Sequence, residues 1–338
     1  MGPLFRYAYV PKAFDWLAGA GLIEHDKRSK GTRNRGRQSS AAPTEELREI
    51  VRTATDGARI VHPPIREPII LRDADKAMTG YTDNRHTTAM RKRVRLFNEG
   101  MTAAAITGAE VADMVRVFNG SSWHLGGRFY GPWQNLPEGE RTDILIGGER
   151  TVELDFKTIH PAMLYAERGR SLPSDCYDIP GFDRGHVKLA VNVLINASTE
   201  ASAVMAIAAG LENDERDQRG RKRLKVDEDI PGYRLNAART LIAVVKKRHA
   251  PIADAFHTGA GLRLQGIDAR IADAVCSFMY GRGIVVLPVH DSFIVQVRHA
   301  DLLCEAMERC AREVGKVALQ VVSKRSNPPV SDVQQKLF

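Results

Sequence analysis

Two aspartates, each held by a predicted strand, are the residues whose type and setting best suit chemistry. Asp155 ends one apolar strand, and Asp291 lies in the polar break of a hairpin rich in Val and Ile. A carboxylate between core strands costs free energy unless a metal ion or a cationic partner compensates it. Arg184 and Lys188 stand four residues apart on a helix predicted between them in sequence, where both can bind a triphosphate. This combination indicates phosphoryl transfer assisted by two Mg²⁺ ions, with Mn²⁺ as a second option.

Two hairpins and a helix must position these residues. One hairpin spans residues 144–155 and turns at a Gly-Gly pair, and the other spans residues 285–295. The helix at 183–197 has an apolar back, and its polar face continues through Asn192 and Asn196. A solvated surface would give the same face, but asparagine forms helix poorly, which favours a binding role.

The rest of the chain predicts mainly helices. Apolar residues at helical spacing, with capping residues such as Thr44, mark most of them. We expect helices near residues 10–24, 44–55, 84–118, 234–256, 267–280 and 300–317, an extended linker at 57–75 and an exposed charged loop at 211–229.

The composition is that of a basic chain with few cysteines. Its 338 residues are 43% hydrophobic, which suffices for a large core, and no apolar run is as long as a membrane span. Four scattered cysteines without metal-ligand or disulfide spacing are typical of a reduced, cytoplasmic protein. The net charge of +8 favours a polyanionic partner, although many ordinary proteins are equally basic.

The N-terminal segment, residues 1–56, is strongly basic. Its first 40 residues carry eight Lys and Arg against three Asp and Glu. A helix with residues 12–20 at its centre, a basic loop at 27–37 and a second helix are similar to the back half of a winged helix-turn-helix domain. Residues 12–20 would then be the recognition helix and 27–37 the wing. A solvated basic arm that touches nucleic acid without reading its sequence explains the pattern equally well.

Five short motifs follow one another between residues 120 and 300. They are Gly127-Arg128-Phe129-Tyr130, Val152-Glu153-Leu154-Asp155, Arg184-x3-Lys188-x3-Asn192-x3-Asn196, Leu264-Gln265-Gly266 and Val289-His290-Asp291-Ser292. In this order they resemble the Gly-Arg-aromatic segment, motif A, the fingers helix, the Gln-Gly element and motif C of the family A DNA polymerases and the related phage-type single-subunit RNA polymerases. Each motif alone is weak, but five in the family's order are more specific.

The resemblance implies a role for each matched position. Asp155 and Asp291, helped by the backbone carbonyl of Phe156, would hold the two metal ions. Arg184 and Lys188 would bind the incoming triphosphate, and Lys188 would join the two aspartates as a catalytic residue. The other implied contacts are nucleotide binding by His160, Asn192 and Asn196, and nucleic-acid binding by Arg128, Gln265 and His290.

Four positions depart from the family's pattern. Asn192 and Asn196 replace two larger residues of the fingers helix, so stacking on the new base pair must come from elsewhere. His160 stands where the DNA polymerases have the glutamate that excludes the ribose 2′-hydroxyl, although a helix-start histidine packed on Pro161 is an equal alternative. Ser292 stands where DNA polymerases have glutamate and RNA polymerases have serine. The choice of sugar therefore stays open.

The resemblance implies an α+β fold, that of a right-hand polymerase, with an antiparallel palm sheet, inserted helical fingers and a small winged-helix-like N-terminal segment. The expected division is a basic segment at 1–56, a linker and helical thumb-like region at 57–118, a palm at 119–322 with fingers at about 176–260, and a flexible tail at 323–338.

We therefore expect a small, template-dependent DNA polymerase of phage, plasmid or host-repair origin. It would bind primer-template DNA and nucleoside triphosphates, with no appended exonuclease and no membrane contact. One alternative is an RNA polymerase or primase that uses ribonucleotides. The other is a DNA-binding replication or regulatory protein without catalysis, against which the intact Asp155, Asp291 and Lys188 argue.

Overall fold

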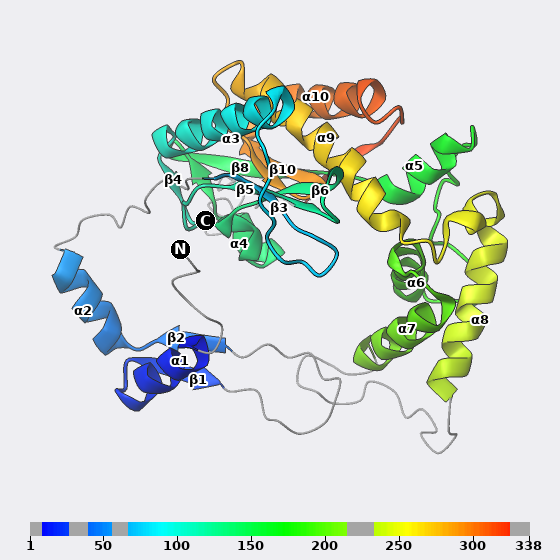
Figure 1. The fold of residues 1–338 in the computed structure, drawn as a ribbon, viewed down its shortest axis with the longest axis horizontal. Coiled ribbons are helices and arrows are strands. Elements are labelled where there is room, and N and C mark those ends of the chain that lie inside the picture. The colour runs from blue at the N-terminus through cyan, green and yellow to red at the C-terminus, as the bar shows by residue number, and fades with distance from the viewer. Residues whose placement is uncertain (1–8, 27–39, 56–66, 215–232, 325–338) are drawn as a thin grey trace, which may run out of the picture. The chain divides into compact units, whose positions relative to one another are not determined.

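The fold is taken from a computed structural model that describes residues 9–26, 40–55, 67–214 and 233–324. The chain divides into two units, Met1–Pro63 and Pro64–Phe338, which are considered separately. Figure 1 shows the elements of both. None of the helices within the described ranges combines the length and the apolar character that crossing a bilayer requires.

The smaller unit pairs two short strands between two helices. Its elements are α1 (Tyr9–Gly19), β1 (Ile23–Asp26), β2 (Ser40–Pro43) and α2 (Glu45–Thr55). The helix expected at 10–24 is therefore too long, because Gly21 adopts a positive φ of 72° and the chain turns into β1. The Thr44 hydroxyl caps α2 by accepting from the Leu47 amide at 3.4 Å. The predicted wing, residues 27–37, lies outside the described residues.

An antiparallel sheet forms the centre of the larger unit. Its strands are β4 (Ile106–Thr107), β7 (Leu145–Ile146), β8 (Glu149–Phe156), β9 (Leu287–Val289), β10 (Ser292–Gln296) and β11 (Val321–Lys324). They follow the order β4-β7-β8-β10-β9, and β11 also pairs with β8. Both predicted hairpins are confirmed, as β7-β8 and β9-β10. The tail expected to be flexible from residue 323 is corrected at its start, since Ser323 and Lys324 belong to β11.

A second, three-stranded sheet lies beside the first. Its strands are β3 (Ile69–Leu71), β5 (Val115–Asn119) and β6 (Ser122–Tyr130). Helix α3 (Arg85–Ala103) lies between β3 and β5 in the sequence. β3 pairs parallel with β5, and β5 antiparallel with β6. The expected helix at 84–118 is thus wrong beyond residue 103, and the expected linker at 57–75 contains a strand. The buried Asn98 amide explains the first error, because it binds the Met114 backbone twice, at 3.1 Å each, and draws the chain back along α3.

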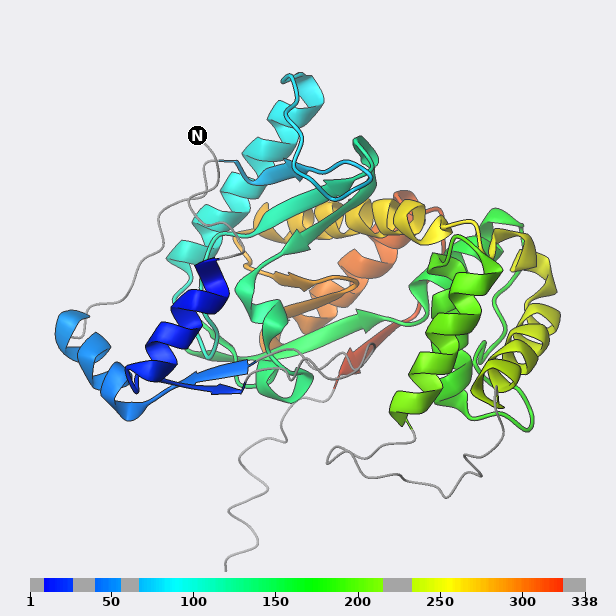
Figure 2. The same cartoon turned by 60° about the horizontal axis from the view of Figure 1, so that its bottom comes forward.

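Two long helices, α9 (Ala260–Tyr280) and α10 (Ala300–Glu313), pack against these sheets (Figure 2). Helix α9 begins earlier than the predicted residue 267, and α10 ends before residue 317. Gly266 allows α9 to run closely along β6, because a Cβ at this position would lie 1.9 Å from the His124 carbonyl oxygen. The Gln-Gly pair at 265–266 is therefore part of the helix, and Gly266 faces β6.

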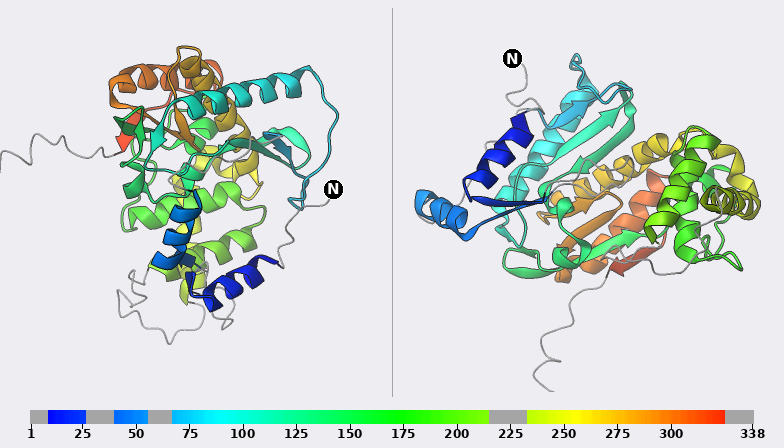
Figure 3. Two further views of the ribbon diagram at one scale, coloured as in Figure 1. Left: turned by 90° about the vertical axis from the view of Figure 1, so that its left-hand side faces the viewer. Right: turned by 90° about the horizontal axis from the view of Figure 1, so that it is seen from below.

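The helices α6 (Arg184–Asn196), α7 (Glu200–Asp214) and α8 (Tyr233–Arg248) contact one another and form a group at one end of the sheet (Figures 1 and 3). The helix predicted at 183–197 is confirmed as α6. The helix predicted at 234–256 is divided, since α8 ends at Arg248 and a 3-10 helix η2 (Ala250–Ala255) follows it. The loop expected at 211–229 is helical up to Asp214, and its remainder lies outside the described residues. The short elements η1 (Pro132–Asn135), α4 (Glu138–Arg141), α5 (Ile159–Glu167) and η3 (Val297–His299) complete the unit.

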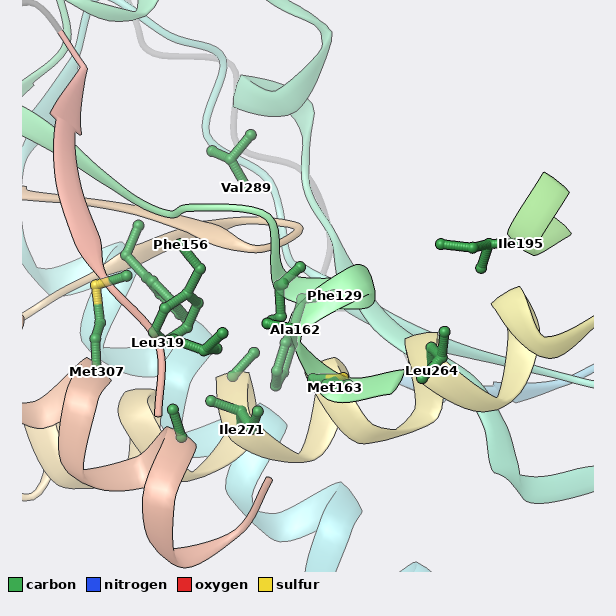
Figure 4. Packing of buried hydrophobic residues seen from close by; sticks show 14 of the residues in the cluster. Phe129, Phe156, Ala162, Met163, Ile195, Leu264, Ile271, Val289, Met307 and Leu319 are labelled. Carbon is green, nitrogen blue, oxygen red and sulfur yellow. The ribbon is translucent and has the colours of Figure 1, made fainter. Parts of the chain in front are cut away.

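Apolar side chains from both sheets and from α9 and α10 join in one buried cluster. Figure 4 shows Phe156 of β8 close to Met307 of α10 and Leu319, with Ile271 of α9 nearby. Phe293 of β10 is completely buried in the same cluster. Dense packing behind β8 and β10 restricts their movement, so polar side chains on their other face or at their ends are held in fixed positions.

Candidate active site

The two predicted aspartates meet where β8 ends and β10 begins. Asp155 is paired in register with Ser292, the residue after Asp291. The Phe156 amide donates to the Asp291 carbonyl at 3.3 Å. Asp291 lies in the turn just before β10, and its negative charge is close enough to Asp155 to act on that carboxylate.

Both carboxylates open into a cavity of about 440 Å³. The predicted site residues that line it with them are Arg128, Phe156, His160, Arg184, Lys188, Asn192, Asn196 and Gln265. These residues come from β6, β8, α5, α6 and α9, which lie far apart in the sequence. His290 is the predicted residue that does not line the cavity.

Asp155 is held in an environment that disfavours its charge. Burial, and next the negative charge of Asp291, raise the pKa of Asp155 to about 6. Its Oδ1 is buried without a hydrogen-bond partner, whereas its Oδ2 lies 3.3 Å from the Lys324 ammonium. Asp155 thus has one oxygen in an ion pair and one without compensation.

The orphaned oxygen and the neighbouring negative charge fit a shared cation. Oxygen ligands of this kind are those that Mg²⁺ and Mn²⁺ prefer. Within the described ranges, no three His, Cys, Asp or Glu side chains are grouped so as to hold a metal ion. Asp155 and Asp291 supply two carboxylates, and the Phe156 carbonyl stays a predicted further ligand.

A buried ionic network lies beside Asp155. Arg141 donates to both oxygens of Glu153, at 2.9 and 3.2 Å, and the Ser292 hydroxyl donates to Glu153 at 2.5 Å. Lys324 reaches the same carboxylate at 3.0 Å. Burial raises the pKa of Glu153, but these hydrogen bonds outweigh it and lower the pKa overall. Glu153 is therefore a satisfied, charged neighbour of the site.

Helix α6 begins with a cap and an ion pair. The Asp183 carboxylate accepts from the His186 amide at 3.0 Å, and Arg184 donates to Asp175 at 2.8 Å. The Arg184 guanidinium also lies over the Tyr177 ring, 5.4 Å from its centre. One turn later, the exposed Lys188 side chain lines the cavity.

The two asparagines of α6 differ from the stacking residues they replace. The Asn196 amide donates to the Asn192 carbonyl at 2.8 Å. Its side chain also lies against α9, since a Cβ on Gly261 would come within 1.9 Å of the Asn196 oxygen. Asn196 is therefore directed at the start of α9 and Asn192 is exposed, while both line the cavity.

A buried aspartate joins two of the predicted residues. Asp268 of α9, which is 2% exposed, accepts from Arg128 at 2.5 Å and lies 2.9 Å from the His160 ring nitrogen Nε2. Burial lowers the pKa of Arg128, but the bonds to Asp268 outweigh it and raise the pKa overall. His160 therefore contacts a carboxylate in addition to its position beside Pro161, and Arg128 is held by the protein itself.

His290 occupies the strained turn between β9 and β10. Its φ is 60°, in the left-handed region, and its ring stands edge-on to Tyr130 at 5.7 Å between centres. Its Nδ1 is buried without a partner. Burial and, next, the Arg128 charge lower its pKa, which favours the neutral ring.

Sequence reasoning missed Glu153, Asp268 and Lys324, although two of them carried a signal. Glu153 precedes Asp155 by two positions, so the strand period places both on one face. Asp268 follows Gln265 by three positions, which is one helix face once α9 begins at Ala260. Lys324 lay in the segment interpreted as a tail, and no local pattern marked it.

The likeness of this chain to known proteins lies in its structure. Neither the known protein-family models nor the curated proteins contain a match to this chain. Among solved structures, the POL domain of Pol1 from M. smegmatis, in complex with DNA primer-template and dNTP, is similar with a TM-score of 0.35 and 15% sequence identity. The likeness covers 82% of this chain and 59% of that chain, so this chain spans less than two thirds of that domain.

Proposed function

We propose that this protein is a template-dependent nucleotidyltransferase, and specifically a DNA polymerase. The observation that carries the proposal is the meeting of Asp155, Asp291, Arg184 and Lys188 in one cavity. Two neighbouring carboxylates and a cationic helix face are the groups that transfer of a nucleotide from a triphosphate requires.

In the proposed reaction, the 3′-hydroxyl of a primer attacks the α-phosphorus of the triphosphate and a new O–P bond forms. The bond from the α-phosphorus to the bridging oxygen breaks, pyrophosphate leaves, and the hydroxyl proton passes to water. Arg184 and Lys188 bind the triphosphate oxygens, and Arg184 exchanges its partner Asp175 for them. Asp155 and Asp291 hold Mg²⁺, whose chemistry when bound is activation of the hydroxyl and neutralisation of the leaving group. Gln265 and Arg128 face the same cavity and would contact the nucleic acid.

The test is extension of a labelled primer on a DNA template with Mg²⁺ and deoxynucleoside triphosphates. We expect incorporation by the unaltered protein and its loss in Asp291→Ala, with DNA binding retained. Asp75→Asn, at an exposed position outside the cavity, is the control that keeps full activity. Absence of incorporation by the unaltered protein would refute the enzyme, and full activity of Asp291→Ala would refute the metal ligands.

A ribonucleotide-using polymerase or primase is the second candidate, and His160 favours it. This residue replaces the glutamate that excludes the ribose 2′-hydroxyl in the DNA polymerases it resembles, and it lines the cavity beside Asp268. The same extension assay with ribonucleotides, with and without primer, separates the two candidates. Preference for ribonucleotides would replace the DNA polymerase assignment and leave the roles of the two aspartates unchanged.

The N-terminal unit is proposed to bind DNA in a winged-helix-like manner. Helix α1 precedes the antiparallel pair β1-β2, with Ile23 opposite Pro43, and α2 follows it. This order agrees with a recognition helix followed by a wing. Separate expression of the larger unit would keep nucleotide incorporation and lose affinity for DNA if the smaller unit has this role.

A further inference from the structure

Strand β11 brings a lysine to the candidate metal site from the far end of the described chain. Lys324 is directly opposite Glu153 in the β8-β11 pair, and Val322 is opposite Asp155. Figure 2 shows β11, in red, beside the long strand β8. The Lys324 ammonium lies 3.0 Å from Glu153 Oε1 and 3.3 Å from Asp155 Oδ2.

The negative charge of Glu153 is already compensated without Lys324. Arg141 already binds both of its oxygens, and the Ser292 hydroxyl donates a further hydrogen bond. Asp155, in contrast, has no hydrogen-bond partner for its buried Oδ1 among the described residues, and its Oδ2 is paired with Lys324. The positive charge of Lys324 is therefore the one that offsets Asp155 among the described residues.

The two carboxylate oxygens of Asp155 therefore lie in different environments. Oδ2 is paired with Lys324, and Oδ1 is left for a cation shared with Asp291. An ion bound at this carboxylate comes close to the ammonium, and like charges repel strongly where the side chains are three quarters buried. Binding of the ion must therefore overcome this repulsion or move Lys324 onto Glu153 alone.

We propose that Lys324 is a positioning residue that competes with the divalent ion for Asp155 and so sets the affinity of the site for metal. The inference rests on the proposed function, because the ion is the cofactor of that reaction. In the absence of an ion, the ammonium pairs with Oδ2 of Asp155. With an ion present, Glu153 retains Lys324, so the lysine stays near the site without occupying it.

The test is titration of the full chain with Mn²⁺ alone, with free Mn²⁺ measured by electron paramagnetic resonance. We expect Lys324→Met and Lys324→Gln to bind Mn²⁺ about tenfold more tightly than the unaltered protein, because a like charge beside the ion is removed. Lys324→Arg keeps the charge and the weaker binding. Lys246→Met removes the same charge from the surface pair with Glu200 and is the matched control, with unchanged binding.

Two variants protect the test against a folding defect, since Lys324→Gln keeps a hydrogen-bond donor that Lys324→Met lacks. Equal or weaker Mn²⁺ binding by both neutral variants would overturn the proposal. If they bind equally while the unaltered protein extends primers, only the role of Lys324 fails. If no form of the protein binds Mn²⁺ or extends primers, the proposed function and the inference fail together.

Discussion

Replacement of Asp155 by asparagine is expected to stabilise the metal-free protein while it removes the proposed activity. The pKa of Asp155 is raised from 3.8 to about 6, first by burial and then by the charge of Asp291. A shift of about two units corresponds to about 3 kcal/mol, which is the cost of keeping this carboxylate ionised in the folded state. Asparagine has nearly the same shape as the protonated acid and avoids that cost.

The sign of the pH dependence follows from the direction of the shift. Because the folded-state pKa lies above the unfolded value, the protonated carboxyl contributes stability that is complete below pH 3.8 and is lost as the pH rises through about 6. Asp155→Asn should therefore exceed the unaltered protein by about 2–3 kcal/mol at pH 8 and match it near pH 4.

Urea unfolding followed by circular dichroism, in EDTA at pH 8 and at pH 4, measures the two differences. Asp75→Asn at an exposed position is the control and should change neither. Added Mg²⁺ should stabilise the unaltered protein and leave Asp155→Asn unaffected. If Asp155→Asn is less stable than the unaltered protein at pH 8, the reasoning is wrong. The ion pair of Asp155 with Lys324 would then outweigh the cost of burial and the repulsion from Asp291.

Three further predictions concern the residues around the cavity. Asp268→Asn leaves Arg128 and His160 without their buried carboxylate. Urea unfolding should therefore show that the free energy of unfolding falls by about 3 kcal/mol, and the ratio of ribonucleotide to deoxynucleotide incorporation should change. An unchanged ratio would mean that His160 has no part in sugar selection. Lys188→Ala should raise the KM for the triphosphate about tenfold, an effect of roughly 1.4 kcal/mol. Asp175→Asn should lower that KM two- to fivefold, or roughly 0.4–1 kcal/mol, because it releases Arg184. Equal KM values for the variants and the unaltered protein in steady-state kinetics would contradict both roles. Gly266→Ala should cost about 1–3 kcal/mol or more in thermal unfolding because its Cβ meets the His124 carbonyl, whereas Gly139→Ala, with open space around it, should be neutral.

Local sequence patterns mark several of the residues that line the cavity. Asp155 lies near the end of an apolar strand and Asp291 interrupts a run rich in Val and Ile, and the register that brings them together follows from pairing β8 with β10. Arg184 and Lys188 share one face of α6 because their spacing matches the helical period. These features depend on neighbours in the sequence, and a single chain is enough to identify them.

The residues that hold those side chains in place were harder to predict, because their partners come from distant elements. Arg128 on β6 and Asp268 on α9 meet only after α9 has packed on β6, and Gly266 permits that contact. Likewise, the helix expected at 84–118 was wrong because Asn98 binds Met114, a tertiary interaction that overrides helical propensity. Side-chain pairing across the fold, rather than local preference, decided these cases.

The environment of Ser292 changes what can be inferred from this residue about the choice between ribonucleotides and deoxynucleotides. From the sequence, a serine in place of glutamate pointed toward the ribonucleotide-using relatives. Ser292 is completely buried, and its hydroxyl donates to Glu153, which Arg141 and Lys324 already neutralise. A glutamate at position 292 would place a second buried carboxylate beside Glu153, and uncompensated burial of such a charge costs several kcal/mol. Glu153 on the neighbouring strand therefore favours a neutral residue at position 292, whichever nucleotide is used, and we propose that a preference for one sugar depends on His160 with Asp268.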